Sequence, residues 1–587
     1  MKASMELKPD RDLLNPNFEG YKLSLDKQPI YTSNLENVLY AVELQDDQFS
    51  YHHAKLLGNH NHLMVDPWVR DNVYLVDKLW NVRHSLTTDT SVSVSPPVYR
   101  IPDADDRQLV PSHYAVRVHF LSADLVVIGD GAGRVHIIET GDRQTGNDVP
   151  WKTLLTKTIP GEGTPSLLVD GVYWIENEAH RVECILSHVT EATAEQKDKY
   201  ESQYLTMIEW ATFTSVDRKS WCLERTRQLL SRKPFHYVAL GREGQSITIA
   251  GEADFVFTID SEQPVVSDEE KEVEKPVIKP PDYTWYQTDE DVNVQFTVPE
   301  GVSNKDIYMT LTFNHVEFGV KNRAPELLVG DLCGEVDVEG STWTMEGRRV
   351  DLYLIKKSSG PWPLVVKGDT RGEMVLNPED VASIHERLAH LTSDQWNPCP
   401  EKAGNRPFNT QQLEECDMYP DDDSTLVRLH GNTHKVTHKA GLGSHQWLFN
   451  VSGPLNSSPQ ICLRHDVDGL LWEQEQGSGD MQFKHTSTFN AFGYVQASKQ
   501  QRKFSLCPPD RSYVVICDNS RHLYLYRQAF TVSTPLRNRK TGQEVKVVAK
   551  QQVVALDTND NILGVVANNE RIYVTTLNKL FMVKISS

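Results

Sequence analysis

Four segments of the chain repeat one pattern: an apolar run, a tight polar turn, and a second run in which apolar residues alternate. They are "DLVVIGDGAGRVHIIE" (124–139), "SLLVDGVYWIENEAHRVECIL" (166–186), "YVVICDNSRHLYLYR" (513–527) and "ILGVVANNERIYVTTLNKLFMVKI" (562–585). Asp-Gly, Asn-Ser and Asn-Asn turns between short strands are typical of β-hairpins, because Gly, Asn and Asp tolerate positive φ. The first and third segments resemble each other most, which indicates a repeated unit.

Repeated hairpins favour a β-propeller, in which each blade buries its faces against its neighbours. Residues 1–262 and 425–587 are rich in strand and turn patterns and poor in helical periodicity. We therefore predict an all-β chain whose propeller has about seven blades, with an N-terminal part in 1–262 and a C-terminal part in 425–587.

A different module interrupts this repeat. In "YTWYQTDEDVNVQFTVPEGVSNKDIYMTLTFN" (283–314), apolar and polar residues alternate in two runs, as in antiparallel strands with one wet face. An acidic, proline-rich linker (263–282) precedes it, and the composition of this linker predicts an extended chain. We expect the module to span 283–365, as an insertion into one propeller.

The return path, 366–424, begins with a predicted helix in "NPEDVASIHERLAHL" (377–391), where Asn377 suits the N-cap and Pro378 the first turn. A long acidic stretch follows. Its carboxylates are interleaved with apolar residues, which suggests either a solvated loop or a docking strip for a partner. The candidate strip consists of Leu413, Glu414, Glu415, Asp417, Met418, Tyr419, Asp421, Asp422 and Asp423.

Composition limits the kinds of ligand that the surface can attract. Sixty Lys and Arg against 81 Asp and Glu give a formal net charge of −21, which disfavours direct contact with nucleic acid or anionic lipid. The sequence has no apolar run long enough to span a bilayer, no N-terminal apolar signal and no Cys-x-x-Cys pair among eight cysteines. We expect an intracellular protein with protein partners.

Ordered motifs identify the inserted module. It contains "YTWYQT", "LVGDLCGEVDVEGSTWTMEG" and "VDLYLIKKSSGPWP" in that order, and together these resemble the CS domain, a β-sandwich shared by the p23 co-chaperone, Sgt1 and NudC proteins. The residues that carry the resemblance, as motif or core positions, are Trp285, Gln287, Gly330, Leu332, Trp343, Leu352, Leu354 and Trp362.

The whole chain resembles the NudC family, although it lacks the N-terminal coiled coil of the founding member, so we expect it to be monomeric alone. The resemblance implies a non-enzymatic co-chaperone or adaptor that works with the ninety-kilodalton heat-shock chaperone. It also implies a DEAH-type RNA helicase as partner, and residence in cytoplasm and nucleus. Two other readings stay open: an enzyme with its active site in the propeller funnel, and a passive scaffold.

Other motifs favour structure over chemistry, so we predict no catalytic, metal or cofactor site. "GDGAGR" (129–134) lies between two strands, whereas a dinucleotide loop needs a helix after it. "HDVDGLLWEQE" (465–475) lacks the third acidic ligand of a calcium loop. The histidines of "YHHAKLLGNHNHL" (51–63) and "HGNTHKVTHKAGLGSH" (430–445) have no cysteine near them to complete a zinc set.

Overall fold

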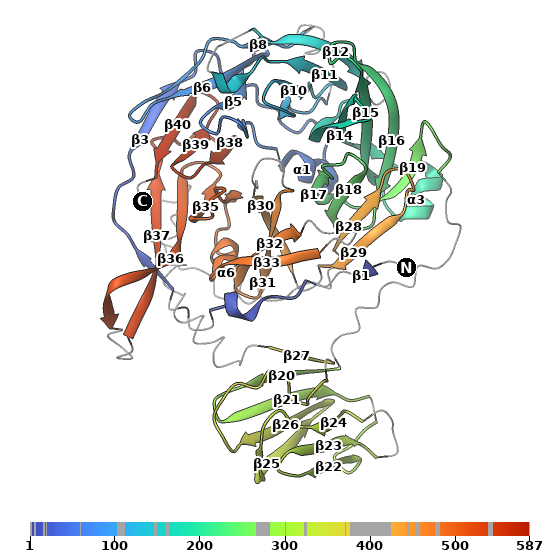
Figure 1. Cartoon of the computed structure of the whole chain (residues 1–587), viewed down its shortest axis with the longest axis vertical. Helices are drawn as coiled ribbons and strands as arrows, with labels where there is room; N and C mark the ends of the chain where they lie inside the picture. Colours follow the sequence, from blue (N-terminus) through green and yellow to red (C-terminus); the bar gives the residue numbers. More distant parts are fainter. Residues whose placement is uncertain are drawn as a thin grey trace. The chain divides into compact units, whose positions relative to one another are not determined.

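The structure is a computed structural model, and it divides the chain into two compact units: Met1–Ser267 with Leu391–Ser587, and Asp268–His390. The first is a propeller and the second a β-sandwich, and each is described by itself (Figure 1). The residues that the structure describes are 3–4, 7–15, 18, 20–58, 60–102, 112–145, 150–159, 164–265, 282–299, 301–321, 326–369, 371–375, 424–442, 445–451, 458–475, 482–537 and 544–585.

Seven sheets make up the described part of the first unit, and we number them as blades in chain order. The first three lie before the insertion. Blade 1 has β4 (Met64–Val65), β5 (Val73–Val76), β6 (Asn81–Thr87), β7 (Val92–Val94) and β8 (Tyr99–Arg100); blade 2 has β9 (Arg117–Phe120), β10 (Leu125–Gly129), β11 (Arg134–Glu139) and β12 (Lys152–Thr158); blade 3 has β13 (Leu167–Glu176), β14 (Ala179–Glu191), β15 (Tyr204–Ser215), β16 (Cys222–Ser231) and β19 (Val256–Asp260).

Of the other four blades, blade 4 combines strands from both sides of the insertion, blade 5 lies wholly after it, and blades 6 and 7 each take one strand from the N-terminal segment. Blade 4 has β17 (Phe235–Leu240), β18 (Ser246–Gly251), β28 (Thr425–His430), β29 (Val436–Gly441) and β1 (Ala3–Ser4); blade 5 has β30 (Gln446–Val451), β31 (Gln460–His465), β32 (Asp468–Glu475) and β33 (Gln482–Phe489); blade 6 has β34 (Arg502–Leu506), β35 (Tyr513–Asp518), β36 (His522–Arg537), β37 (Glu544–Ala555) and β2 (Tyr21–Leu23); blade 7 has β38 (Gly564–Ala567), β39 (Arg571–Thr575), β40 (Lys579–Lys584) and β3 (Ile30–Asn34). These seven sheets confirm the predicted propeller.

The propeller core lies between blades, because most strands are apolar on both faces. In β10, Val126 and Ile128 join the core that blades 1 and 2 share, and Leu125 and Val127 join the core of blades 2 and 3. Further shared cores join blades 3 and 4, 4 and 5, 6 and 7, and 7 and 1. Burial on both faces explains why the blades depend on their neighbours.

A side-chain oxygen organises the hairpin turn in several blades. Asp130 Oδ1 accepts hydrogen bonds from the backbone N–H groups of Ala132 (2.8 Å) and Arg134 (2.9 Å). Asp77, Asp518 and Asn568 do the same in the β5–β6, β35–β36 and β38–β39 turns. This local capping accounts for the repeated sequence pattern. It also shows that "GDGAGR" is a hairpin turn, as predicted.

The N-terminal segment 3–34, here called the strap, adds outer strands to three blades. β1 pairs with β29 and β2 pairs with β37, both in parallel, and β3 pairs antiparallel with β40. Between β1 and β2, the short helix η1 (Arg11–Leu13) lies beside blade 5, where Asp10 N–H donates to His485 Nδ1 (3.1 Å). The strap therefore runs along blades 4 to 7, and β3 completes blade 7 (Figure 1).

The insertion interrupts blade 4. β18 pairs with β28, from Ser246 opposite His430 to Gly251 opposite Thr425, although β19 and the whole second unit separate them in sequence. Three short helices complete the described propeller: α1 (Tyr51–Gly58), α3 (Ala194–Tyr200) and α6 (Phe492–Ala497), with the 3-10 turn η2 (Arg143–Thr145). None of the described helices is both long and apolar enough to cross a bilayer.

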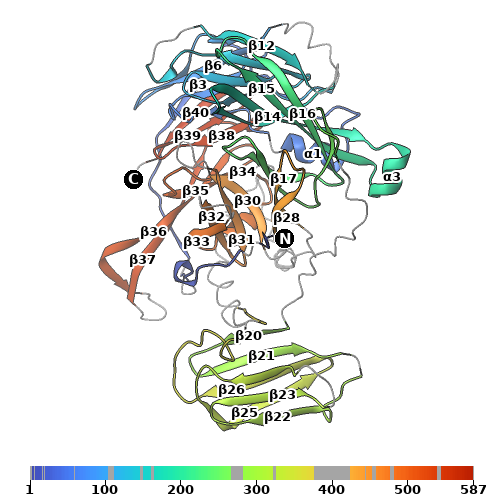
Figure 2. The same cartoon turned by 45° about the vertical axis from the view of Figure 1, so that its right-hand side comes forward.

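The second unit packs two sheets face to face (Figure 2). One sheet has the strand order β25 (Val336–Glu346), β26 (Arg349–Lys356), β21 (Asp291–Thr297), β20 (Tyr283–Gln287) and β27 (Gly372–Met374), and the other has β22 (Ile307–Leu311), β23 (His315–Val320) and β24 (Leu328–Asp331). Val292, Val294 and Phe296 of β21 are buried in the shared core, as their alternation predicts. The predicted helix 377–391 lies outside the described residues.

Candidate interaction surfaces

Two of the sandwich motif residues, Gln287 and Trp362, form one polar network with Lys356 at an end of the sandwich. Lys356 Nζ donates to Gln287 Oε1 (2.9 Å), Thr288 O (2.7 Å) and Gly360 O (2.8 Å). Gln287 also exchanges two hydrogen bonds with the backbone of Trp362, at 2.7 and 2.9 Å. Burial lowers the pKa of Lys356. These hydrogen bonds give the motif a structural role, because they tie the ends of β20 and β26 to the loop that carries Trp362.

The other motif residues are also structural. Trp285, Leu332, Leu352 and Leu354 are fully buried in the sandwich core, and Trp362 is nearly so. Gly330 has a φ of +139°, and a Cβ there would lie 2.6 Å from Val366 Cγ1.

Trp343 differs from the predicted core position. Its ring packs edge-on against Phe318 at 6.2 Å between centroids, but the side chain is only partly buried. The reason is its place on β25, the edge strand of the five-stranded sheet, where no further strand covers it.

The outer face of the five-stranded sheet carries an aromatic patch, here called the tyrosine face. Tyr286, Asn293 and Tyr353 are successive cross-strand partners on β20, β21 and β26, so their side chains project from the same face. Tyr353 and the nearby Ile355 are both more than a third exposed. An exposed aromatic and aliphatic cluster of this kind suits contact with another protein.

Asn293 gives the tyrosine face an unused polar group. The residue is 2% exposed, yet neither its amide nitrogen nor its carbonyl oxygen has a hydrogen-bond partner in the described structure. Buried amides are normally paired, because leaving one unpaired costs about 1–3 kcal/mol. One donor and one acceptor side by side match the backbone of a bound peptide.

The charged side chains of Arg349 and Asp351 lie beside the tyrosine face. Arg349 Nε lies 3.1 and 3.0 Å from the two carboxylate oxygens of Asp351, two residues along β26 from Tyr353. Loss of hydration raises the pKa of the Tyr286 hydroxyl, and the neighbouring Tyr353 and Asp351 add to the effect. Tyr286 therefore stays a neutral hydrogen-bonding group at physiological pH.

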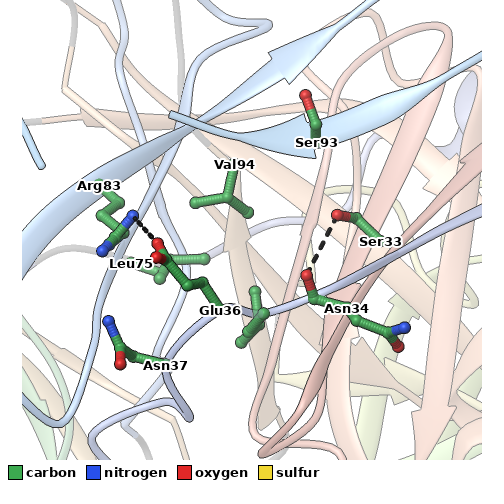
Figure 3. Close-up of a pocket in the computed structure, with 9 residues that line it drawn as sticks. Ser33, Asn34, Glu36, Asn37, Leu75, Arg83, Ser93 and Val94 are labelled. Atoms are coloured by element: carbon green, nitrogen blue, oxygen red, sulfur yellow. Dashed lines mark hydrogen bonds and ion pairs between the residues drawn. The ribbon is translucent and has the colours of Figure 1, made fainter. Parts of the chain in front are cut away.

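The propeller has a small pocket of about 140 Å³ where the strap meets blade 1 (Figure 3). Arg83 crosses it, pairing with Asp77 (2.8 Å) and with Glu36 beyond β3 (3.2 Å). The Arg83–Glu36 pair joins the N-terminal segment to the first blade, so the pocket belongs to the closure of the ring.

A larger pocket, about 390 Å³, lies between blades 4 and 5. Arg428 there pairs with Glu243 at 2.7 Å, and Phe483 and Ile461 supply apolar walls.

The histidine motifs are used in packing. His52 shares a hydrogen bond with Thr206 (2.7 Å), His53 with Ser50 (2.7 Å), and His434 with Asp260 (2.7 Å). Across the described residues, no three His, Cys, Asp or Glu side chains gather in a way that could hold a metal ion.

The "HDVDGLLWEQE" segment is the β31–β32 turn, with Asp466 at a φ of +53°. The acidic strip, Leu413 to Asp423, lies outside the described residues.

Comparison with known proteins decides the family. A sequence model of the CS domain matches residues 281–356. NudC domain-containing protein 1 of Mus musculus is 36% identical over 591 residues, covering 100% of this chain and 99% of the mouse protein. The chain belongs to the NudC domain-containing protein 1 family. The Xenopus tropicalis member is 35% identical over 592 residues, with 100% and 99% coverage.

Within this family the sandwich unit is the CS domain. Human NudC domain-containing protein 2 is 35% identical over 74 residues, which are 13% of this chain and 46% of that protein. The WD40 domain of SCAP from fission yeast covers 90% of this chain at 9% identity with a TM-score of 0.30. The propeller assignment rests on the seven sheets themselves.

Sequence reasoning did not find the tyrosine face. Period-2 alternation marks Tyr286, Asn293 and Tyr353 as outward residues, but only the register brings them together.

Proposed function

We propose that this chain is a non-enzymatic adaptor of the co-chaperone type, which binds protein partners through its CS domain and its propeller. The observation that carries the proposal is the tyrosine face, where exposed Tyr353 and Ile355 surround the unpaired amide of buried Asn293. Aromatic residues around a desolvated polar group are the composition of binding hot spots.

The partners that we propose are the ninety-kilodalton heat-shock chaperone and a DEAH-type RNA helicase, met in cytoplasm and nucleus. Family membership supports both. The acidic strip supports the second, because an RNA helicase carries a basic channel for phosphates and the strip holds six carboxylates between Glu414 and Asp423.

Calorimetry with the purified full-length chain and each purified partner tests whether the CS domain contributes to binding. Tyr353→Ala should weaken binding of the chaperone about tenfold or more, as for a hot-spot aromatic. Phe313→Ala is the matched control: Phe313 is 51% exposed in the turn between β22 and β23, on the other sheet. Equal affinities for the two variants would refute a role for the tyrosine face.

The acidic strip is tested with the helicase. Reversing Asp421, Asp422 and Asp423 to Lys should weaken the complex and flatten its salt dependence, because rim charges mainly speed association and are screened over about 8 Å at physiological salt. An unaltered affinity from low to high salt would assign the strip to solubility.

A further inference from the structure

A group of basic side chains converges at the inner strands of the propeller. The first strands of consecutive blades contact one another, β4 with β9, β9 with β13, and β34 with β38, so they form the inner wall of the ring. Residues 60–63 lead into β4, Arg117 begins β9, and Lys503 lies on β34. We call His60, His62, Arg117 and Lys503 the basic cluster.

Hydrogen bonds and a ring contact place the segments that carry these groups side by side. His62 N–H and His62 Nδ1 both contact Leu563 O, at 3.2 and 2.9 Å, and Lys503 Nζ donates to the adjacent Ile562 O at 2.7 Å. The rings of His60 and His62 meet edge-on, with 4.4 Å between centroids. Val118 N–H donates to Met64 Sδ (3.1 Å), which brings the start of β9, and so Arg117, beside the same segment.

His60 is an orphaned polar group inside this cluster. The residue is 3% exposed, and neither of its ring nitrogens has a hydrogen-bond partner among the described residues. His62 Nε2 is likewise buried and unpaired there. Because a carbonyl oxygen only accepts, His62 Nδ1 carries the proton toward Leu563 O, and Nε2 is left as a free acceptor or, once protonated, a donor.

The positive charge of the cluster is poorly balanced. Asp170 is the carboxylate whose charge acts on Arg117, but it already lies 3.4 Å from His119 Nε2 and accepts the N–H of Leu240 at 2.8 Å. Lys503 Nζ donates to the carbonyl oxygen of Ile562, which carries no charge. Lys503 is exposed at its surface, and partial loss of hydration lowers its pKa.

From these observations we propose that the basic cluster is a binding site for a small multiply charged oxyanion of the phosphate type. Arg117 on β9 and Lys503 on β34 supply positive charge, and His60 and His62, just before β4, donate after taking up protons. A compact anion fits because His60 is almost inaccessible, so only a ligand group of few atoms reaches it. In a chain of net charge −21, such a site concentrates positive charge where the outer surface does not.

Binding should be linked to proton uptake. Burial lowers the pKa of His60, and the charges of His62, Arg117 and Lys503 lower it further; burial also lowers the pKa of His62 to about 4. Besides these four groups, Asp170 faces Arg117, and buried Cys517, on β35, lies near Lys503. A bound anion favours the protonated imidazoles, so affinity should rise as pH falls from 7.5 to 6.0.

The affinity test uses the full chain and inorganic pyrophosphate, titrated by calorimetry in low-chloride buffer at pH 6.5. We expect saturable binding at one site, at least tenfold weaker for Lys503→Gln and for Arg117→Gln. Lys152→Gln is the matched control, since Lys152 is an exposed lysine on β12, the outermost strand of blade 2. Its affinity should stay within twofold of the parent.

Sulfate then tests the pH dependence, because its charge is constant between pH 6 and 8. Hydrogen exchange at the imidazole C2 position gives a readout without mutation: pyrophosphate should raise the pKa of His60. It should leave that of His188 unchanged, because His188 is a buried histidine of blade 3 whose pKa burial lowers to about 4.

Three results would overturn the proposal: no saturable pyrophosphate binding by the intact chain, equal affinity in all variants, or equal loss in Lys152→Gln. Binding of a hexaglutamate peptide without binding of pyrophosphate would also overturn it, in favour of an acidic protein segment as the ligand. If Arg117→Gln fails to fold, the proposal is tested by the affinity of Lys503→Gln and by the pKa of His60 from hydrogen exchange.

Discussion

At the scale of the residue, buried polar groups set the behaviour of both units. Lys356 is 8% exposed in the CS domain and donates to three oxygens, all of them uncharged. It ties the ends of β20 and β26 to the loop that carries Trp362. The cost of burying its charge is offset by complete hydrogen bonding, so its replacement would leave those oxygens unpaired.

The tryptophans of the CS domain should differ in their effect on stability. Trp362→Ala removes a nearly buried ring and should lower the free energy of unfolding by about 3–5 kcal/mol. Trp343→Ala should cost less, since that side chain is only partly buried on the edge strand. Urea unfolding of a 268–390 fragment measures both, and a larger loss for Trp343 would contradict the placement of the two rings.

Because of Asp468, the free energy of unfolding of the propeller should fall as pH rises. Loss of hydration raises the pKa of its carboxyl from 3.8 to about 7, and the neighbouring Asp466 adds to the effect. Between about pH 4 and pH 7 the folded state therefore holds a proton that the unfolded state has released. Stability then falls with increasing pH, by up to about 1.4 kcal/mol per pH unit for this group.

Asp468→Asn tests this dependence. The amide oxygen can still accept the N–H of Ala491, which Asp468 Oδ1 accepts in the parent chain. The variant should gain melting temperature relative to the parent as pH rises from 5 to 8. Parallel curves for the two proteins would show that Asp468 titrates normally.

At the scale of the element, the strap is the feature with the largest consequence. A propeller must join its last blade to its first, and here β3 pairs with β40 over five residues while the Arg83–Glu36 ion pair lies just beyond it. Tyr21 anchors the middle of the strap: it is 5% exposed, and its hydroxyl donates to Asn490 O at 2.6 Å. The strap thus adds a strand to each of blades 4, 6 and 7 and lies beside blade 5.

Stepwise deletion should separate the roles of the strap strands. Removing residues 1–27 takes away β1, η1 and β2, which are outer additions to complete sheets, and should lower the melting temperature moderately. Removing residues 1–34 also takes away β3 and opens blade 7, so cooperativity should be lost. Calorimetry of the two shortened chains measures this, and identical melting curves would count against ring closure by β3.

At the scale of the whole molecule, the second unit is inserted at a point where it leaves the strand pairing of the propeller intact. The second unit enters between β18 and β28, whose six residue pairs hold blade 4 together without any contribution from the sandwich. The propeller cores also exclude the sandwich residues, which form their own cluster.

Replacement of residues 268–390 by a Gly/Ser linker should therefore leave a cooperative propeller. The two flanks expressed separately should not fold, because blades 4 and 7 each need strands from both. Expressed together, they should associate. A cooperative melting transition in either flank alone would mean that the propeller is two domains.

The local features could be predicted from the amino-acid sequence: hairpin turns at Asp130 and Asp518, alternating strands in 291–297, the CS motif and the insertion between two strand-rich flanks. These depend on turn chemistry and side-chain period, which neighbouring residues carry. Only the folded chain shows which distant strands pair, as with β3 and β40, and which side chains lie on one face, as with Tyr286, Asn293 and Tyr353. Register and ring closure bring such residues together across hundreds of positions, and no local pattern records that proximity.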